Sequence, residues 1–479
     1  MRRWREAMKT WWQAQNPWYL GGCALLVLAA ILRALFLSSP QMPVFDEVHF
    51  PYFAQRYLAG QPFFDIHPPL AKWLIALSEW LFGYNQSADY SLAVAGAGAT
   101  DYFTRIIPTI LGNFSFSWRF MPYLFGMGFL LVIWQLAWHI TKSYQAAFFA
   151  LLLVSTDSLL FVYGRTGLMD GIMYFFVFAA FLACVLALKQ RKVFRQVGYL
   201  LLAGVLSGLA MSVKWLGMAA LILCFFWLLF HFQKIHKPRG LIAVLAALIL
   251  AVSTYLFSFI GETNNWQQLA IDVNQPTHSY WDKLYQWHDQ SFLFNKNLKD
   301  SHPYGSTWWS WPLMLRPLLY YYEQVDPITF TPARDLLTQT PLSVCTSDGS
   351  CWVRLIAAIG NPIIWWCSFV SFLITFFFIW PKKSWQWALL LSSIVMYLPW
   401  LFIGRVSFLY YFMGVAIVWQ VLLALNLWEW YKKPSGKIAV PVLLVLAAVW
   451  FFLAYPVLTA TPIPAWYIPK VLWFPSWRT

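Results

Sequence analysis

The chain has 479 residues, of which 60% are hydrophobic, 20% aromatic and only 11% charged. Soluble proteins carry about 25% charged residues, so this composition excludes a soluble globular domain and predicts a polytopic membrane protein. The net charge of +14 does not indicate nucleic-acid binding, because the cations lie in short runs between apolar segments, as membrane orientation requires.

The N-terminal segment is basic and aromatic and leads into a first apolar stretch over 19–38. This pattern resembles a signal peptide, but no small-residue cleavage site follows and Arg33 interrupts the apolar run. We therefore interpret it as an uncleaved first span that is preceded by a cytoplasmic, interfacial leader.

The rest of the chain supplies further apolar stretches of the length that a bilayer requires, about 20 residues each. Together they predict an all-α polytopic membrane protein, a single domain over 1–479 with about eleven transmembrane helices. The segments are 19–38, 118–140, 144–163, 168–188, 198–213, 216–233, 240–260, 355–380, 385–403, 406–430 and 437–457.

The positive residues orient these segments. With eleven spans, the basic N-terminus, the run at 189–195 and the lysine pairs at 382–383 and 432–433 all fall on one side. The positive-inside rule makes that side the cytoplasm. We therefore expect an integral plasma (inner) membrane protein with a cytoplasmic N-terminus. Two large loops, 39–117 and 261–354, are then extracytoplasmic, and the second is long enough to hold short helices and irregular segments.

The first outer loop contains an acid pair, Asp46 and Glu47, and a second polar cluster with Asp65, His67 and Lys72. Carboxylates are costly near a bilayer unless they line a wet cavity, and a carboxylate can take a proton from an attacking hydroxyl. Residues 70–82 after the two prolines predict an amphipathic helix in the interface. The alternative is a solvated loop whose acids pair with nearby Arg or Lys.

Several cations share this outer face: Arg119, Arg165, Lys214 and Arg405. Guanidinium groups suit phosphate oxygens and lysine adds a point charge, so these side chains could hold a lipid phosphate. Alternatively they reach the headgroups or pair with acids. The segment around His302 is dense in aromatics, which suit sugar rings but also suit the membrane interface.

Cys345 and Cys351 lie close together in the second outer loop. An oxidising exterior would allow a disulfide between them, with two free thiols as the alternative. We find no metal site of Cys/His type, no P-loop and no Rossmann fingerprint. We therefore predict no cofactor, leave dependence on a divalent metal open, and consider an ATP-driven pump unsupported.

Five motifs resemble, in order, those of the protein O-mannosyltransferases, membrane enzymes of the GT-C class (glycosyltransferase family 39). They are FDEVHF (45–50), FFDIHPPLAK (63–72), GRTGLMD (164–170), SVKWLG (212–217) and HPYGSTWWSWP (302–312). The stretch over 345–366 is similar to the bacterial members. Loop 261–354 is too short for the β-trefoil MIR domain of the eukaryotic members.

The resemblance implies a GT-C fold and a reaction. Mannose moves from a polyprenyl phosphate carrier to Ser or Thr hydroxyls of a protein that crosses the membrane, with inversion at the anomeric carbon. By motif position, Asp46 would be the general base and Glu47 would help to place the acceptor. Arg119 is a candidate for the carrier phosphate and Lys214 is a further one. The 65–67 cluster would shape the loop or contact the sugar.

Two other functions compete with this interpretation. Another GT-C enzyme would use the same type of donor and outer-face acid but a lipid or glycan acceptor. A secondary transporter would place polar groups near the bilayer midplane in two related halves. The charges gather at the outer rim instead, and we see no repeated halves.

Overall fold

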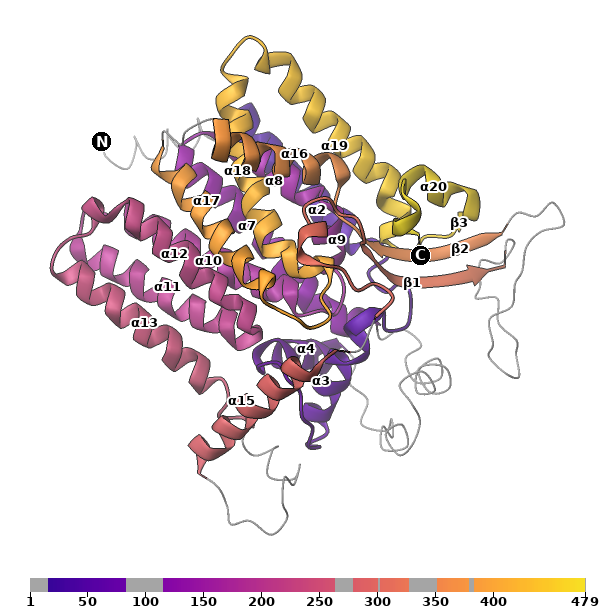
Figure 1. Ribbon diagram of the computed structural model, residues 1–479, viewed down its shortest axis with the longest axis horizontal. Helices are drawn as coiled ribbons and strands as arrows, with labels where there is room; N and C mark the ends of the chain where they lie inside the picture. Colours follow the sequence, from indigo (N-terminus) through magenta and orange to yellow (C-terminus); the bar gives the residue numbers. More distant parts are fainter. Residues whose placement is uncertain are drawn as a thin grey trace.

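The computed structural model describes residues 16–82, 115–262, 279–299, 302–326, 351–378 and 383–478, and these segments form a helical bundle with a small sheet at one side (Figure 1). The longer helices are α2 (Pro17–Ala34), α3 (Phe50–Leu58), α4 (Leu70–Phe82), α7 (Ser115–Thr141), α8 (Tyr144–Ser155), α10 (Asp170–Ala187), α11 (Val193–Val213), α12 (Ala219–Phe230), α13 (Arg239–Phe257), α15 (Tyr280–Asn297), α16 (Pro362–Leu373), α17 (Ser384–Tyr397), α18 (Met413–Tyr431) and α19 (Gly436–Leu458).

Short helical turns connect many of these helices and build the outer loops. They are η1 (Phe45–Val48), α9 (Ser158–Tyr163), η3 (Trp215–Met218), η4 (Phe232–Lys234), η5 (Trp308–Ser310), η6 (Ile374–Phe378), η7 (Leu398–Leu401), η8 (Leu409–Phe412), η9 (Ala465–Tyr467), α20 (Ile468–Val471) and η10 (Pro475–Trp477).

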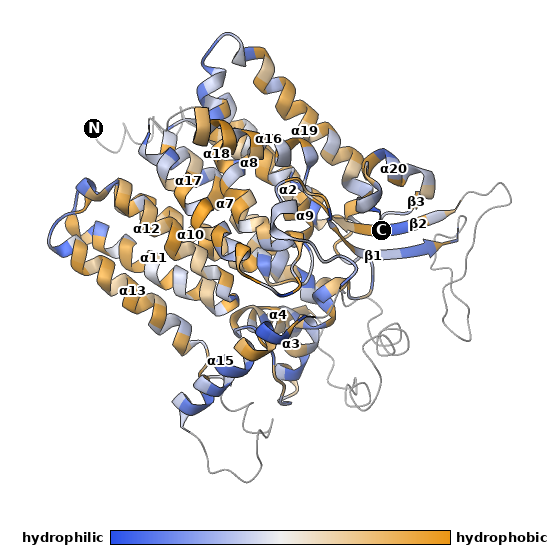
Figure 2. Cartoon of the chain, in the orientation of Figure 1, coloured by the Kyte–Doolittle hydropathy of each residue, from blue (hydrophilic) through white to orange (hydrophobic). Residues whose placement is uncertain are grey.

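Seven helices in the described part of the chain are long and apolar enough to cross a bilayer. Shorter apolar helices cover Tyr144–Ser155, Trp215–Phe230 and Pro362–Phe378. Hydrophobic residues dominate the long helices, whereas hydrophilic residues gather in the connections and in α15 (Figure 2). The seven are Pro17–Ala34, Ser115–Thr141, Asp170–Ala187, Val193–Val213, Arg239–Phe257, Leu409–Tyr431 and Gly436–Leu458.

These helices confirm the predicted helical membrane protein, while the number of eleven spans stays a prediction. The predicted segment 144–163 is interrupted, because the Asp157 side chain accepts from the Leu160 N–H and starts α9 as a separate helix. The predicted segment 355–380 begins too early. Its first residues belong to a strand, and Asn361 and Pro362 start α16.

The core of the bundle surrounds α18, nearly all of which is buried. This helix packs against α8, α16 and α17, while α10 packs between α7 and α11. Helix α13 contacts α11 and leaves most of its apolar surface exposed. Such a surface is costly in water, so α13 faces lipid.

A three-stranded antiparallel sheet adds to the predicted all-α architecture. Its order is β1 (Leu318–Val325), β2 (Trp352–Ala358) and β3 (Ile463–Pro464). Strand β1 pairs with β2 in a register that joins Leu318 to Ala358 and Val325 to Trp352. The sheet therefore ties the second outer loop to the C-terminal segment, where helices and irregular segments alone were expected.

The loop over 39–117, which is predicted to be extracytoplasmic, supplies η1, α3 and α4 within its described part, and α4 confirms the predicted helix over 70–82. Figure 1 shows α3, α4 and α15 together at one end of the bundle. The indole N–H of Trp287 in α15 donates to the Asp65 backbone carbonyl at 2.9 Å. This bond joins the two outer loops beside the predicted site.

Candidate active site

The acid pair lies in η1, a single turn that is fixed by the residue before it. Phe45 has a left-handed φ of 49°, a conformation that costs a non-glycine residue free energy unless its surroundings hold it. Its ring stacks on Tyr320 of β1 with centroids 4.4 Å apart and planes 4° apart. The second outer loop therefore holds the turn that presents Asp46 and Glu47.

Glu47 is fully buried and forms an ion pair with Arg119 of α7. Its Oε1 accepts from Arg119 Nε at 2.8 Å, and its Oε2 accepts from Arg119 Nη2 at 2.7 Å. The Val44 N–H also donates to Oε2 at 2.9 Å. Such a bidentate pair has strict geometry, so Glu47 fixes the turn and is not free to meet an acceptor.

Arg119 has no donor left for a phosphate. A guanidinium group has five N–H bonds, and two of those of Arg119 go to Glu47. The other three go to the carbonyls of Leu37, Pro40 and Met42, each at 3.0 Å. The geometry thus disagrees with the expectation that Arg119 holds the carrier phosphate, because all five bonds are used to fold the segment before the acid pair. We call Glu47 and Arg119 with these partners the clamp.

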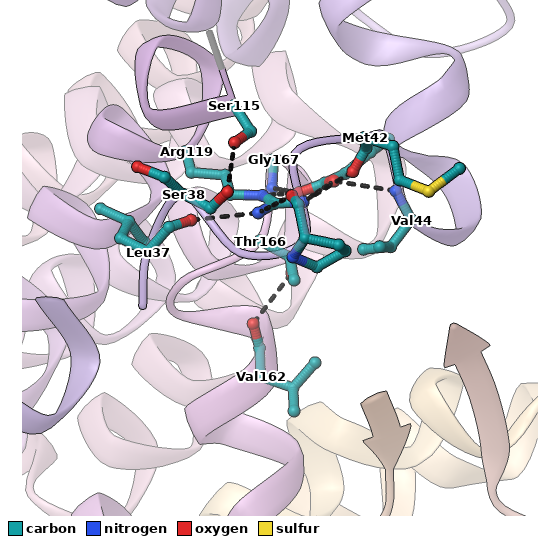
Figure 3. Close-up of polar contacts among 11 residues, drawn as sticks. Leu37, Ser38, Met42, Val44, Ser115, Arg119, Val162, Thr166 and Gly167 are labelled. Carbon is teal, nitrogen blue, oxygen red and sulfur yellow. Dashed lines mark hydrogen bonds and ion pairs between the residues drawn. The ribbon is translucent and has the colours of Figure 1, made fainter. Parts of the chain in front are cut away.

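The GRTGLMD motif completes the clamp from the connection between α9 and α10. The Gly167 N–H donates to Glu47 Oε1 at 2.5 Å. A Cβ atom at this position would lie 2.6 Å from the Trp118 ring, so only glycine permits the approach. The neighbouring Thr166 hydroxyl donates to the Val162 carbonyl at 2.9 Å and fixes the turn (Figure 3).

Asp46 has a different environment from its neighbour. Its carboxylate is partly buried, and within the described part of the chain no hydrogen-bond donor lies in reach of it. Burial raises the pKa of Asp46, and the positive charges of His49, Lys214 and His67 oppose this rise in part. A carboxyl group with a raised pKa and free lone pairs is suited to take a proton from a hydroxyl.

Lys214 is the lysine that faces Asp46. It stands in extended conformation between α11 and η3, so its side chain leaves the helix. Its Nζ lies 3.2 Å and 3.4 Å from the two carboxylate oxygens of Asp170, the last residue of the GRTGLMD motif. The same Nζ lies over the rings of Tyr410 and Tyr411, at 5.3 Å and 5.7 Å from their centroids.

Asp65, His67 and Lys72 bond mainly to one another, and of the three only the His67 side chain is partly exposed. Buried Lys72 donates to Asp65 Oδ2 at 2.8 Å and to the His67 carbonyl at 2.7 Å. His67 Nδ1 lies 3.2 Å from Asp65 Oδ1. Burial alone would raise the pKa of Asp65, but the charges of Lys72 and His67 outweigh it and lower the pKa. Asp65 therefore orients the His67 ring, which acts electrostatically on Asp46.

The remaining predicted residues lie apart from Asp46. Arg165 is buried, donates to the Leu35 carbonyl at 3.0 Å and stacks over Phe161. His302 and Arg405 line a separate groove between the second outer loop, the connection 404–407 and the C-terminal segment. Arg165 therefore stabilises the fold, and it interacts electrostatically with Glu47 and Arg119 of the clamp.

Cys351 is disulfide-bonded, whereas Cys345 lies outside the described residues. The pairing of these two cysteines therefore stays a prediction. Within the described ranges, no group of three or more His, Cys, Asp or Glu side chains is placed to hold a metal ion. Dependence on a metal stays open.

Sequence reasoning missed the aromatic residues around the site. Tyr320, Tyr410 and Tyr411 surround Phe45 and Lys214, but the sequence contains 24 tyrosines. The sequence pattern alone does not distinguish the tyrosines of the site from those of an aromatic belt at the membrane interface. Lys72, by contrast, was part of the predicted polar cluster, and its bonds to Asp65 and to the His67 carbonyl place it there.

With this geometry in place, comparison with known proteins assigns the family. The family model described as dolichyl-phosphate-mannose-protein mannosyltransferase matches residues 23–267, and the model of the C-terminal four-span region of protein-O-mannosyltransferase matches residues 280–477. The chain belongs to the protein O-mannosyltransferase family. The family that the five motifs indicated is thereby confirmed.

A curated protein O-mannosyltransferase relative matches nearly the full length. The polyprenol-phosphate-mannose–protein mannosyltransferase of Mycolicibacterium smegmatis is 27% identical over 95% of this chain and 92% of its own length. Full-length similarity of this kind extends the family assignment over both outer loops.

Two solved structures share the fold. The Saccharomyces cerevisiae protein O-mannosyltransferase Pmt1–Pmt2 complex bound to the sugar donor matches with a TM-score of 0.74 at 15% identity, covering 96% of this chain and 92% of that chain. ArnT of Cupriavidus metallidurans bound to undecaprenyl phosphate matches with a TM-score of 0.52 at 13% identity, covering 92% and 74%. The predicted GT-C fold is thereby confirmed.

Proposed function

We propose that this chain transfers mannose from polyprenyl phosphate mannose to Ser or Thr hydroxyls of secreted or membrane proteins, with inversion of the anomeric carbon. We place it in the inner membrane, with a cytoplasmic N-terminus and the site on the extracytoplasmic face. The observation that carries the proposal is the contrast within the acid pair. Asp46 keeps free lone pairs and a raised pKa, while Glu47 is wholly bonded in the clamp.

Asp46 acts as the general base. As the acceptor hydroxyl attacks the anomeric carbon of mannose, its proton passes to the Asp46 carboxylate. The bond between the anomeric carbon and the phosphate oxygen breaks, and the electron pair leaves with the polyprenyl phosphate. One displacement on the face opposite the leaving group inverts the configuration.

Lys214 stabilises the charge that develops on the leaving phosphate. It is the lysine on the Asp46 side of the site, and Asp170 holds its Nζ in place. A fixed cation lowers the barrier when the charge beside it is larger in the transition state than in the ground state. His67 and His49 add positive potential beside Asp46, which keeps the base ionised enough to accept a proton.

The clamp supports this chemistry without touching the substrate. General-base catalysis requires the carboxylate within hydrogen-bond reach of the hydroxyl, and a misplacement of about 1 Å can cost two orders of magnitude in rate. Since Glu47 is the next residue after Asp46, the bonds that fix Glu47 also fix the base. We therefore assign Glu47 and Arg119 as positioning residues.

Purified protein tests this function when it is reconstituted with polyprenyl phosphate mannose and a Ser/Thr peptide. Mass spectrometry should find hexose on a hydroxyl of the peptide, and NMR should show an anomeric configuration opposite to that of the donor. If the peptide stays unmodified while a lipid or glycan acceptor receives the sugar, the chain is the alternative GT-C transferase. If the configuration is retained, the single-displacement mechanism is wrong.

A further inference from the structure

A basic groove lies beside the active site and has no part in the chemistry described above. It has a volume of about 760 Å³ and lies between Lys299 with residues 302–316, the connection 404–407 and the C-terminal segment. The Ser306 N–H donates to the Ser407 carbonyl at 2.8 Å, so two of these segments are joined at its base. A cavity of this size suits a small-molecule head or cofactor.

Three cations line the groove, namely Lys299, Arg316 and Arg405, and no acidic residue among those that the structure describes does. Within the described residues none of the three forms an ion pair. Arg405 donates only to neutral oxygens, those of the Asn295 amide and the Tyr411 hydroxyl. Like charges held together without a counter-charge repel each other, so the groove favours an anionic ligand.

One of these cations also has an unused donor. The Nε of Arg316 is buried and has no hydrogen-bond partner within the described residues. A buried donor without a partner costs free energy that a ligand oxygen would recover. The groove is lined by serine and threonine hydroxyls as well. Guanidinium and hydroxyl donors around one space are the groups that bind phosphate.

The rim of the groove is apolar, which favours a phosphate that carries a lipid tail. Trp309 is 56% exposed and Leu315 is 41% exposed, and both line the groove. Phe402 and Ile403, immediately before it, are 81% and 39% exposed. In a membrane protein, large exposed apolar side chains contact lipid. The head of a lipid phosphate can therefore occupy the groove while its chain lies along this rim.

Tyr411 lies close to a cation of the groove and to a cation of the active site. Its ring centroid is 5.3 Å from the Arg405 guanidinium and 5.7 Å from Lys214 Nζ. The two cations differ in charge balance, because Asp170 compensates Lys214 and no acid compensates Arg405. The active-site side suits a phosphodiester with one negative charge, and the groove suits a more highly charged phosphate.

We propose that this groove receives the released carrier, a polyprenyl phosphate monoester, after sugar transfer. The proposal rests on the proposed function, because sugar transfer converts a phosphodiester into a monoester. A phosphate monoester carries a charge of about −1.5 to −2 at pH 7, so three uncompensated cations attract it more strongly than they attract the donor. Passage past Tyr411 would then clear the active site for the next donor.

Binding of farnesyl phosphate, a short prenyl phosphate monoester, tests the proposal in nanodiscs of neutral phosphatidylcholine. We expect saturable binding that weakens about tenfold or more in Arg316→Gln, from the strength of a charged hydrogen bond. Arg316→Lys should retain more affinity than Arg316→Gln. The control Lys470→Gln changes an exposed lysine outside the groove, and it should bind as the native protein does.

Affinities for other ligands distinguish between the possible occupants of the groove. Equal affinity for inorganic phosphate, or equal displacement by phosphatidylglycerol, would overturn the assignment to a prenyl carrier. Equal affinity for mannosyl farnesyl phosphate would overturn the preference for the monoester. Unchanged binding in Arg316→Gln would overturn the location. Asp46→Asn should lose mannosyl transfer but keep its affinity for farnesyl phosphate. Transfer and binding therefore test the proposed catalysis and the proposed carrier site separately.

Discussion

The substitution Glu47→Gln tests the clamp, because it removes one charge and changes little in shape. In the native protein both Glu47 oxygens accept two N–H donors each, from Arg119, Val44 and Gly167. A glutamine must point its own NH₂ group at one of these donor pairs. It also leaves the Arg119 guanidinium, only 1% exposed, without a counter-charge. Removing one partner of a buried ion pair costs about 3–5 kcal/mol.

A control is available in Glu429, a partly exposed acid that pairs with the exposed side chains of Lys383 and Lys432. Because exposed ion pairs contribute about 0–1 kcal/mol, Glu429→Gln should change stability little. Denaturant-induced unfolding in one detergent should give Glu47→Gln a free energy of unfolding lower by about 3–5 kcal/mol. Its mannosyl transfer should fall as well, since the base loses its support.

Equal free energies of unfolding for Glu47→Gln and Glu429→Gln would contradict the structural role of the clamp. So would a Glu47→Gln variant that keeps native stability but loses all transfer. That second result would mean that Glu47 acts on the substrate directly, as the sequence suggested, and that the bonds to Arg119 and Gly167 do not carry its main role.

Two further substitutions address neighbouring parts of the site. Gly167→Ala places a Cβ 2.6 Å from an indole ring atom and should destabilise by about 1–3 kcal/mol, whereas Gly198→Ala, with no atom within 4 Å of its Cβ, should not. Thermal unfolding of both distinguishes overpacking from a general glycine effect. Lys214→Gln removes a cation that lowers the pKa of Asp46 and exposes it to unpaired Asp170. The acidic limb of the kcat/KM profile should move to higher pH, and a shift to lower pH would contradict this arrangement.

Much of the fold followed from hydrophobic length and charge, which are local properties of the sequence. Helix α4 has the predicted bounds of 70–82, and the long apolar helices fall where apolar segments were expected. The small sheet was not predicted, because β1 pairs with strands at 352–358 and 463–464 across long stretches of chain. Such pairing depends on tertiary contacts that no local pattern records.

The site, too, could be predicted from the sequence only where the signal is local. The motifs identified Asp46, the Asp65 cluster and Lys214 as polar groups that a membrane protein keeps for a purpose. Only the family resemblance divided the acid pair into a base, Asp46, and a residue that places the acceptor, Glu47, because adjacent carboxylates have identical local signals. Only the partners of Glu47, which come from positions 44, 119 and 167, show that it is wholly bonded. Arg119 was misread for the same reason, since its carbonyl partners over 37–42 are invisible in sequence.

The central claim is that Asp46 is the base, and Asp46→Asn tests it most directly. Asparagine keeps the size of the side chain and cannot accept the proton, so transfer from polyprenyl phosphate mannose to a Ser/Thr peptide should fall by about 10²–10⁴. The variant should remain folded in the membrane, and the exposed control Asp289→Asn should transfer at the native rate. Transfer by Asp46→Asn within a few-fold of native would contradict the account.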